Sequence, residues 1–326
     1  MQRSFWAPGR VNLIGDHTDY AGGLVLPIAV EFGIRVDIEP SERIALTSDG
    51  RAVDVAPDGT GTPDRWGRYP AAVAAELAEL GRPAIGIRGV VESNLPIGTG
   101  LSSSAALEVA VALALCAVAD FAVARMELAL ACRRAELRAV GVPCGIMDQA
   151  ASLLGREGSA LLLDCRSLEY RYVPLPDELA IVVVDSGERQ LEHTGYADRQ
   201  RELAAGMPAR VRHVETENQR VRDTVKALEG GEIGELGRLF RSSHESLRDD
   251  YEVSTPELDR LVEHAYDAGA LAARLTGGGF GGSIVVLAAQ SRAGTIADQL
   301  GGRVVRASAG ARELTPRRMG SLPGRA

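Results

Sequence analysis

The sequence predicts a two-domain α+β protein. With 326 residues, the chain is long enough to form two domains that each have a core. Short alternating or continuous apolar segments, typical of strands, occur among longer segments with helical spacing. The composition changes after a continuous apolar strand at residues 180–185, because residues 186–250 are strongly polar and helical. We therefore predict an N-terminal domain over residues 1–187 and a C-terminal domain over residues 188–326.

The first strand leads directly into a dense polar block. Residues 10–14 alternate as a strand does, and Gly15 ends it. Four polar residues follow without a gap: Asp16, His17, Thr18 and Asp19. Carboxylates and an imidazole can bind the hydroxyl groups of a polyhydroxylated ligand, although an Asx-rich turn would contain the same residue types. Strands at residues 29–38 and 44–47 come next, and a Gly-, Pro- and Asp-rich loop follows at 49–65.

A glycine- and serine-rich segment precedes the longest apolar helix. A helix at residues 69–80 and a strand at residues 85–92 lead into this segment, Pro96 to Ala106. Its glycines let the backbone approach a ligand closely, and its serines open a helix whose first N–H groups are unpaired. The combination is typical of a phosphate-binding loop, although a loop that only caps a buried helix would also show it. The residues concerned are Gly98, Thr99, Gly100, Leu101, Ser102, Ser103 and Ser104. The helix that follows, residues 105–119, is apolar nearly all round and is expected to be buried.

Two acidic residues further along the chain could each serve more than one role. Glu136 lies on the predicted helix at residues 125–140 among arginines, which by itself indicates a surface ion pair. Asp148 is flanked by apolar residues near the start of another helix. That position suits a capping aspartate, and it equally suits a carboxylate that orients or deprotonates a substrate hydroxyl.

The C-terminal half contains a second glycine-rich segment. Strands at residues 272–275 and 283–288 flank Thr276 to Gly282, and an amphipathic helix at residues 258–269 precedes them. A flexible hairpin would explain the glycines, and so would a rigid turn that lies close to a ligand. The basic tail from residue 315 onward is expected to fray.

Bulk properties exclude several classes of function. The net charge of −8 argues against nucleic acid or an anionic membrane as the partner. The four cysteines form no CxxC pair, so we expect reduced thiols and no zinc site. Lys226 is the only lysine, and neither a Walker A loop nor a protein-kinase strand surrounds it. We see no signal segment at the N-terminus, and the apolar run at residues 109–118 is too short to span a bilayer, so we expect a cytoplasmic protein. The sequence does not determine the oligomeric state, for which a monomer is our expectation.

Three separated blocks resemble the galactokinase family of the GHMP small-molecule kinases. Gly9 to Tyr20 resembles the galactokinase signature, Pro96 to Ala106 the phosphate loop of the superfamily, and Thr276 to Gly282 its third motif. Shorter stretches agree with the same family: Gly145 to Gln149, Arg212 to Glu217, and Ser243 to Ser254. The resemblance implies a two-lobed fold. Its N-terminal lobe would hold a mixed β-sheet with helices, its C-terminal lobe would be ferredoxin-like, and the active site would lie in the cleft between them.

The resemblance also implies an enzyme that uses ATP and Mg²⁺ to phosphorylate a sugar at its anomeric hydroxyl. By position in the motifs, Asp148 corresponds to the catalytic carboxylate, and Arg10 to the arginine that pairs with it and stabilises the transition state. Ser104 and Glu136 correspond to the two magnesium ligands, which replaces the surface role suggested by the local sequence around Glu136. Gly98 to Ser104 would surround the nucleotide phosphates. The residues at the sugar positions are Asp16, His17, Thr18, Asp19 and Tyr196.

The sequence departs from the family pattern at several positions. Asp16 stands where the family has glutamate, Leu137 stands where asparagine follows the magnesium-binding glutamate, and Ser283 replaces the usual cysteine after the third motif. Only six residues precede Ala7, fewer than in the family's usual leading segment. Because aspartate is one methylene shorter than glutamate, we expect the change at Asp16 to affect the sugar end of the site.

These departures leave alternatives open. Galactose would give galactose 1-phosphate, but a related GHMP sugar kinase could act on N-acetylgalactosamine, a pentose or a uronic acid. A non-catalytic sugar sensor would be expected to have damaged catalytic motifs, whereas Arg10, Asp148 and the serines of the phosphate loop are all intact. Trp66 and Tyr69 resemble the aromatics that lie beside adenine in the family.

Overall fold

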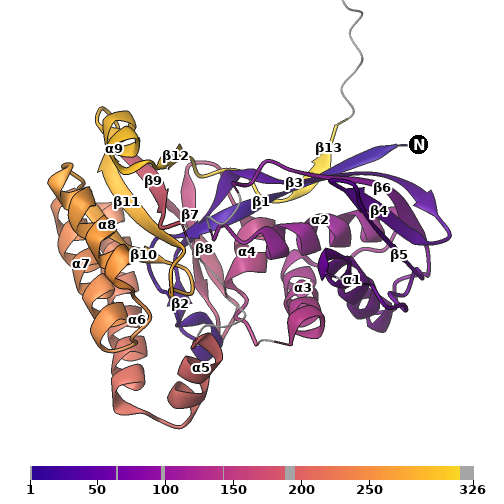
Figure 1. The fold of residues 1–326 in the computed structure, drawn as a ribbon, viewed down its shortest axis with the longest axis horizontal. Helices are drawn as coiled ribbons and strands as arrows, with labels where there is room; N and C mark the ends of the chain where they lie inside the picture. The colour runs from indigo at the N-terminus through magenta and orange to yellow at the C-terminus, as the bar shows by residue number, and fades with distance from the viewer. Residues whose placement is uncertain (1, 64, 97–99, 142, 188–194, 316–326) are drawn as a thin grey trace, which may run out of the picture.

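Three sheets and the helices packed against them make up the described part of the chain. The computed structural model describes residues 2–63, 65–96, 100–141, 143–187 and 195–315. Figure 1 shows an elongated molecule, with the N-terminal half toward the right and helices α6–α9 toward the left. The α+β class predicted from the sequence is confirmed.

The largest sheet has six strands in the order β13–β1–β3–β6–β4–β5. Their bounds are β1 (Arg3–Asn12), β3 (Pro27–Ser41), β4 (Ile44–Ser48), β5 (Arg51–Val55), β6 (Gly86–Ser93) and β13 (Arg312–Leu314). The sheet is mixed, because β4 runs parallel to β6 while the other pairs are antiparallel. The predicted loop at residues 49–65 was partly wrong, since β5 begins at Arg51. Asp49 and Gly50 both have positive φ, 47° and 74°, and they form the two-residue turn of a β4–β5 hairpin.

Four helices lie on one side of this sheet (Figure 1); α2 and α4 pack directly on it, and α1 and α3 pack on these helices and on each other. They are α1 (Arg68–Glu79), α2 (Ser103–Val118), α3 (Arg125–Val140) and α4 (Met147–Leu154). As predicted, α2 is buried almost throughout, and its core contacts extend to both α1 and the sheet. A small antiparallel sheet adjoins them, with β2 (Leu24–Val25), β7 (Ser159–Asp164) and β8 (Tyr170–Pro174). Two short 3-10 turns, η1 (Asp19–Ala21) and η2 (Arg65–Gly67), complete this half.

The C-terminal sheet has four antiparallel strands in the order β10–β11–β9–β12. They are β9 (Leu179–Asp185), β10 (Ala272–Thr276), β11 (Ser283–Ala289) and β12 (Arg303–Val305). The polar segment after β9 forms three helices, α5 (Tyr196–Ala204), α6 (Pro208–Gly230) and α7 (Ile233–Asp249), and α8 (Pro256–Asp267) and α9 (Ala293–Leu300) follow later. The sequence analysis predicted α8, β10 and β11, and it missed β8, β12, β13 and α9, which are short.

Strand β9 connects the two halves of the core. Ile181 and Val183 belong to the large N-terminal core cluster, whereas Val182 and Val184 belong to the C-terminal one. Successive side chains of a strand point to opposite faces, so β9 is buried on both faces, as its continuous apolar sequence predicted. The domain boundary predicted after residue 187 remains a prediction. Because β9 pairs with β11 and β12, we propose a boundary that precedes β9.

Candidate active site

An ion pair between β1 and α4 lies at the centre of the site. The Arg10 guanidinium donates to both Asp148 carboxylate oxygens, with N–O distances of 2.6 Å from Nε to Oδ1 and 2.6 Å from Nη2 to Oδ2. Its Nη1 donates to the Gly100 carbonyl at 2.8 Å. Arg10 is buried, while the Asp148 side chain is 25% exposed and can be reached by a substrate. Two parallel charge-assisted bonds fix both the position and the plane of this carboxylate.

The serine-rich loop meets the same carboxylate. Ser102 precedes α2, and its hydroxyl donates a short hydrogen bond to Asp148 Oδ2. Its backbone is left-handed, with φ at 57°, a conformation that non-glycine residues adopt at a cost of order 1–3 kcal/mol and mainly at functional sites. The Ser102 side chain accepts no hydrogen bond from the first turn of α2. The first N–H groups of the helix can therefore bind another acceptor. A helix N-terminus of this kind favours an anion.

The structure thus brings Gly100, Leu101, Ser102, Ser103 and Ser104 to the start of α2, beside the Arg10–Asp148 pair. Gly98 and Thr99, which we also predict to contact phosphate, lie outside the described residues. The phosphate-binding role of the loop stays a prediction.

Ser104 and Glu136 meet as predicted from the resemblance. The Ser104 hydroxyl donates to Glu136 Oε1 at 2.8 Å. The other oxygen, Oε2, accepts from Gln149 Nε2 at 2.7 Å and from the Cys144 thiol at 3.3 Å. Burial raises the pKa of Glu136, and the nearby Asp148 carboxylate raises it further. A bound cation would relieve this cost of burying negative charge.

A fully buried carboxyl lies behind this partly buried pair, and the sequence analysis missed it. Glu108 is fully buried in α2, and its Oε2 accepts from Gln149 Nε2 at 3.0 Å. Burial raises the pKa of Glu108 well above its usual value, and Glu136 adds to this effect. Gln149 thus donates to Glu108 and Glu136 from one nitrogen. The signal was present in the sequence, because Glu108 is the one acidic residue within a long apolar helix.

On the opposite side of Asp148, the polar block after β1 forms a cluster of rings and carboxylates. His17 Nδ1 lies 2.8 Å from the Tyr20 hydroxyl, and its ring lies 4.7 Å from that of Tyr251 and 5.6 Å from that of Tyr196. Like Ser102, His17 has a left-handed backbone, with φ at 63°. The residues assigned to sugar binding therefore do converge in part, since His17 and Tyr196 are neighbours although 178 residues separate them in the chain.

Asp19 lies beside the segment that leads into α4. Burial raises the pKa of Asp19 to about 7, and the nearby Asp148 carboxylate contributes to the shift. A side chain at Gly145 would place its Cβ only 1.7 Å from Asp19 Oδ2. Any side chain at position 145 would therefore push the Asp19 carboxylate out of its present place. The sugar-binding roles of His17, Asp19 and Tyr196 stay predictions.

Asp16 and Thr18 differ from what we expected of sugar ligands. Asp16 is 1% exposed, its Oδ1 accepts from the Gly277 amide at 2.8 Å, and its Oδ2 lies 2.6 Å from Arg274 Nη2. The Thr18 hydroxyl is fully buried between two carbonyls, those of Gly15 at 2.8 Å and Leu24 at 2.7 Å. The polar atoms of both side chains are engaged by protein groups, so this geometry does not favour a direct role in substrate binding.

The third motif forms the turn between β10 and β11. Gly277 has a φ of 83° and directs its amide at Asp16, and Phe280 is a left-handed residue whose amide donates to the Val253 carbonyl at 2.7 Å. The turn is therefore fixed by contacts to distant segments. This favours the rigid turn over the flexible hairpin.

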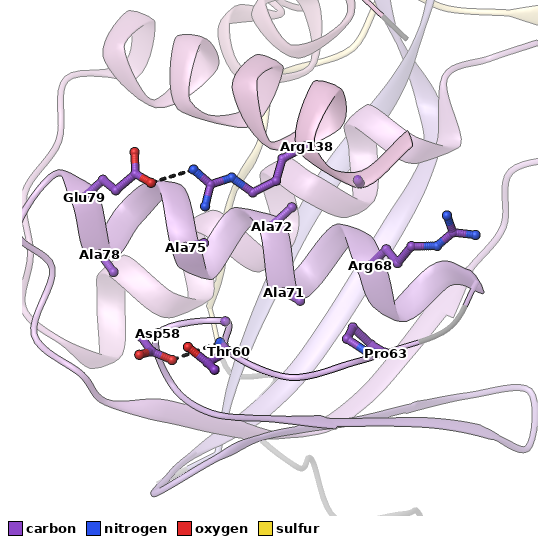
Figure 2. A pocket seen from close by; sticks show the side chains of 12 residues that line it. Asp58, Thr60, Pro63, Arg68, Ala71, Ala72, Ala75, Ala78, Glu79 and Arg138 are labelled. Atoms are coloured by element: carbon purple, nitrogen blue, oxygen red, sulfur yellow. Dashed lines mark hydrogen bonds and ion pairs between the residues drawn. The ribbon is translucent and has the colours of Figure 1, made fainter. Parts of the chain in front are cut away.

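A surface pocket of about 450 Å³ lies away from these residues. Figure 2 shows it between the loop around Asp58 and Thr60 and the alanine-rich face of α1, with Arg138 hydrogen-bonded to Glu79 at its edge. Its lining includes none of the described site residues. Trp66 and Tyr69, expected beside adenine, are partly buried against the N-terminal core near the start of α1, and their role stays a prediction.

Comparison with known proteins agrees with this arrangement. Three family models match the chain: the galactokinase galactose-binding signature over residues 3–40, the GHMP kinase N-terminal domain over 68–156, and the GHMP kinase C-terminal domain over 224–306. The chain is 41% identical to a galactokinase of Thermotoga maritima over 320 residues, which covers 90% of this chain and 91% of the relative. It is 38% identical to a galactokinase of Thermococcus kodakarensis, with 86% and 88% covered.

Similarity to solved structures agrees with these sequence comparisons. The crystal structure of Lactococcus lactis galactokinase complexed with galactose superposes with a TM-score of 0.89 at 30% identity, covering 96% of this chain and 95% of that one. A mevalonate kinase structure shares the fold alone, with a TM-score of 0.71 at 19% identity. Within the residues described, no helix is long and apolar enough to cross a membrane. On these grounds the chain, with its paired Arg10 and Asp148 and its GHMP kinase fold, belongs to the galactokinase family.

Proposed function

We propose that this chain transfers the terminal phosphoryl group of ATP to the anomeric hydroxyl of galactose, which yields galactose 1-phosphate and ADP. One observation carries the proposal: Asp148 is held by two bonds from Arg10 and one from Ser102, directly in front of the α2 N-terminus. Phosphoryl transfer depends on positioning and on charge stabilisation more than on covalent chemistry. A partly exposed carboxylate fixed beside an anion-binding helix start meets both needs.

Asp148 is proposed to bind and deprotonate the sugar hydroxyl, and Arg10 to stabilise the negative charge that develops during the transfer. The carboxylate accepts a hydrogen bond from the anomeric hydroxyl and takes its proton as the new oxygen–phosphorus bond forms. The bond between the terminal phosphorus and the bridging oxygen of ATP breaks, and ADP leaves. Arg10 keeps Asp148 in its plane and supplies positive charge where negative charge develops.

The magnesium assignment is supported by the chemistry of the donor set. A serine hydroxyl and a carboxylate oxygen 2.8 Å apart are hard oxygen ligands of the kind Mg²⁺ prefers. Among the described residues, no group of three or more His, Cys, Asp or Glu side chains could hold a metal ion. This suits an ion that binds through one or two protein oxygens together with phosphates. When bound, Mg²⁺ neutralises charge on the phosphate oxygens, and Ser104 and Glu136 would hold it at the α2 end of the site.

Galactose is favoured over the other sugars considered. The relatives described above carry the name galactokinase, and the similar Lactococcus lactis protein was solved with galactose. Nothing in these comparisons points to N-acetylgalactosamine, a pentose or a uronic acid. His17, Asp19 and Tyr196 are the proposed sugar-binding side chains. A cytoplasmic monomer remains our expectation from the sequence.

An ATP-consumption assay with Mg²⁺ tests the proposal. The panel contains galactose, N-acetylgalactosamine, glucose, arabinose, galacturonate, mevalonate and homoserine. We expect strong turnover with galactose and little with the others. Strong turnover with another sugar would mean that this sugar is the substrate and that the mechanism is unchanged. Turnover with none of the compounds would contradict the proposal.

A further inference from the structure

The proposed catalytic steps leave several blocks of the sequence without a role. These are Arg212 to Glu217, Ser243 to Ser254, and Arg274 together with the turn that follows it. The structure brings all of them to one place, around residues 12–24, which we call the signature loop. This loop carries His17 and Asp19.

Glu217 of α6 binds the backbone of the signature loop. Its Oε1 accepts from the Gly15 amide at 3.0 Å, and the carboxylate also accepts from the Ser243 hydroxyl at 2.7 Å and from Arg220 Nε at 2.7 Å. Glu217 is fully buried. Burial opposes ionisation, but Arg274 and Arg220 outweigh it and hold the pKa of Glu217 at about 2. A full negative charge therefore faces the loop from the C-terminal half.

Arg274 of β10 is the positive counterpart. It is fully buried, its Nη2 lies 2.6 Å from Asp16 Oδ2 and 3.7 Å from Glu217 Oε1, and its Nη1 donates to the Leu13 carbonyl at 2.9 Å. One guanidinium thus joins two carboxylates from different segments. Removing one partner of a buried ion pair leaves the other charge uncompensated, which is strongly destabilising. The two segments that carry the charges are therefore held against moving apart.

Further contacts extend this arrangement along the loop. The Thr276 hydroxyl donates to the Asn12 carbonyl at 2.8 Å, and the Leu24 amide donates to Asn218 Oδ1 at 2.7 Å. His213 Nε2 lies 3.1 Å from the Asp16 carbonyl oxygen. The C-terminal half therefore holds the signature loop at both ends and in the middle, through backbone groups as well as through Asp16.

We propose that Glu217 and Arg274 are positioning residues for sugar recognition, and that Asp16 belongs to this buried ionic strut instead of binding a sugar hydroxyl. The strut comprises Asp16, Glu217 and Arg274. It fixes the backbone that presents His17 and Asp19, so its effect on the sugar is indirect. The inference rests on the proposed function for the identity of the sugar, but the strut itself can be tested without any substrate.

The kinetic test compares Glu217→Gln and Asp16→Asn with the wild type. Both variants keep the side-chain shape and one acceptor oxygen and remove the charge. The substrates are galactose and its 2-, 3-, 4- and 6-deoxy analogues. The loop presents two proposed sugar-binding side chains, His17 and Asp19, so no single hydroxyl carries the whole effect of its displacement. We therefore expect the KM for galactose and for every deoxy analogue to rise, by up to about 100-fold. The KM for ATP should change little.

The outcomes separate the two roles of Asp16. If Asp16 bound one hydroxyl directly, Asp16→Asn would leave the KM unchanged for the one analogue that lacks that hydroxyl. That result would overturn the assignment of Asp16. An unchanged sugar KM in Glu217→Gln would overturn the assignment of Glu217. If Glu217→Gln fails to fold, Thr276→Val removes only the hydroxyl contact to Asn12 and should show a smaller rise in the KM for every sugar.

Hydrogen exchange provides the substrate-free readout. We expect peptides that cover the signature loop and Gly277 to exchange about tenfold faster in Glu217→Gln, which corresponds to about 1.4 kcal/mol of lost protection. The matched control is Glu76→Gln, another buried carboxylate that pairs with arginines, Arg134 and Arg138, away from the loop. It should leave loop exchange unchanged. Equal exchange in Glu217→Gln and the wild type would refute the strut. A wild type inactive on galactose would refute only the proposed function.

Discussion

The proposed phosphate side and the proposed sugar side of the site are built by different kinds of contact. On the phosphate side, the start of α2, Asp148 of α4 and Glu136 of α3 come from neighbouring helices of the N-terminal half. On the sugar side, the signature loop is held by residues about 200 or more positions away in the chain, such as Glu217 and Arg274. The first arrangement follows from local helix geometry, whereas the second depends on how the two halves pack. Changes on each side should therefore affect different kinetic constants.

The largest effect is expected at the residue shared by both sides. We predict that Asp148→Asn folds but lowers kcat by about 10³-fold, because asparagine cannot accept the hydroxyl proton. Steady-state kinetics gives the loss, and thermal unfolding shows whether the fold is kept. Near wild-type turnover in a folded Asp148→Asn would remove Asp148 from the reaction.

Gly145→Ala should act on the sugar side alone. The added Cβ would lie 1.7 Å from Asp19 Oδ2, so the carboxylate has to move. Because small misplacements of a binding group are costly, we expect the KM for galactose to rise by about 100-fold while the KM for ATP changes little. Gly294→Ala is the matched control for steric effects, since a Cβ there meets nothing within 4 Å and the backbone is not left-handed. A parallel rise in both KM values for Gly145→Ala would show that the sides are not separable here.

Gln149→Leu should act on the phosphate side alone. Leucine leaves Glu136 and Glu108 without the amide that both now share. Groups that orient a metal ligand typically contribute 10–100-fold to metal affinity. We therefore expect the Mg²⁺ concentration for half-maximal activity to rise about tenfold.

Binding of Mn²⁺ in the presence of ADP, followed by electron paramagnetic resonance, gives a readout for Gln149→Leu that needs no turnover. Unchanged Mn²⁺ affinity would mean that Gln149 does not orient Glu136. The galactose KM serves as the internal control, since it should stay near the wild-type value.

Asp19 leads to a prediction about stability and pH instead of about a kinetic constant. Asp19 has a pKa of about 7 in the folded protein against an ordinary value of 3.8, so the unfolded chain ionises first as pH rises. Its contribution to stability is thus full below pH 3.8 and is progressively lost up to pH 7. Between pH 3.8 and pH 7, the melting temperature of Asp19→Asn should rise relative to that of the wild type. Above pH 7 the difference between the two melting temperatures should stay constant. A difference that is the same at pH 4 and pH 8 would contradict the raised pKa.

The sequence predicted the paired residues at the centre of the site better than the residues that hold the signature loop. Arg10, Asp148, Ser104 and Glu136 lie within short motifs, and they meet in the structure in the predicted pairs. Their roles were carried by the family resemblance, because the local sequence around Glu136 alone indicated a surface ion pair. The structure partly buries Glu136 instead, since α3 packs against α2 and α4 along that face.

The contacts of the supporting residues could not be predicted, for physical reasons. Glu108 and Arg274 are charged residues in otherwise apolar elements, and their partners, Gln149 and Asp16, come from distant segments. A sequence pattern gives the periodicity of an element but not which buried charge lies opposite another. The β4–β5 hairpin was different, because the Asp49–Gly50 turn was visible in the sequence and was read as part of a loop.

The most direct test of the account is to identify the product. Wild-type protein is incubated with ATP, Mg²⁺ and galactose, and the reaction is followed by ³¹P nuclear magnetic resonance. We predict that one phosphorus signal, coupled to the anomeric proton of galactose, appears in step with ADP. Release of free phosphate, or a phosphoryl group on another hydroxyl of the sugar, would contradict the placement of Asp148 beside the anomeric hydroxyl.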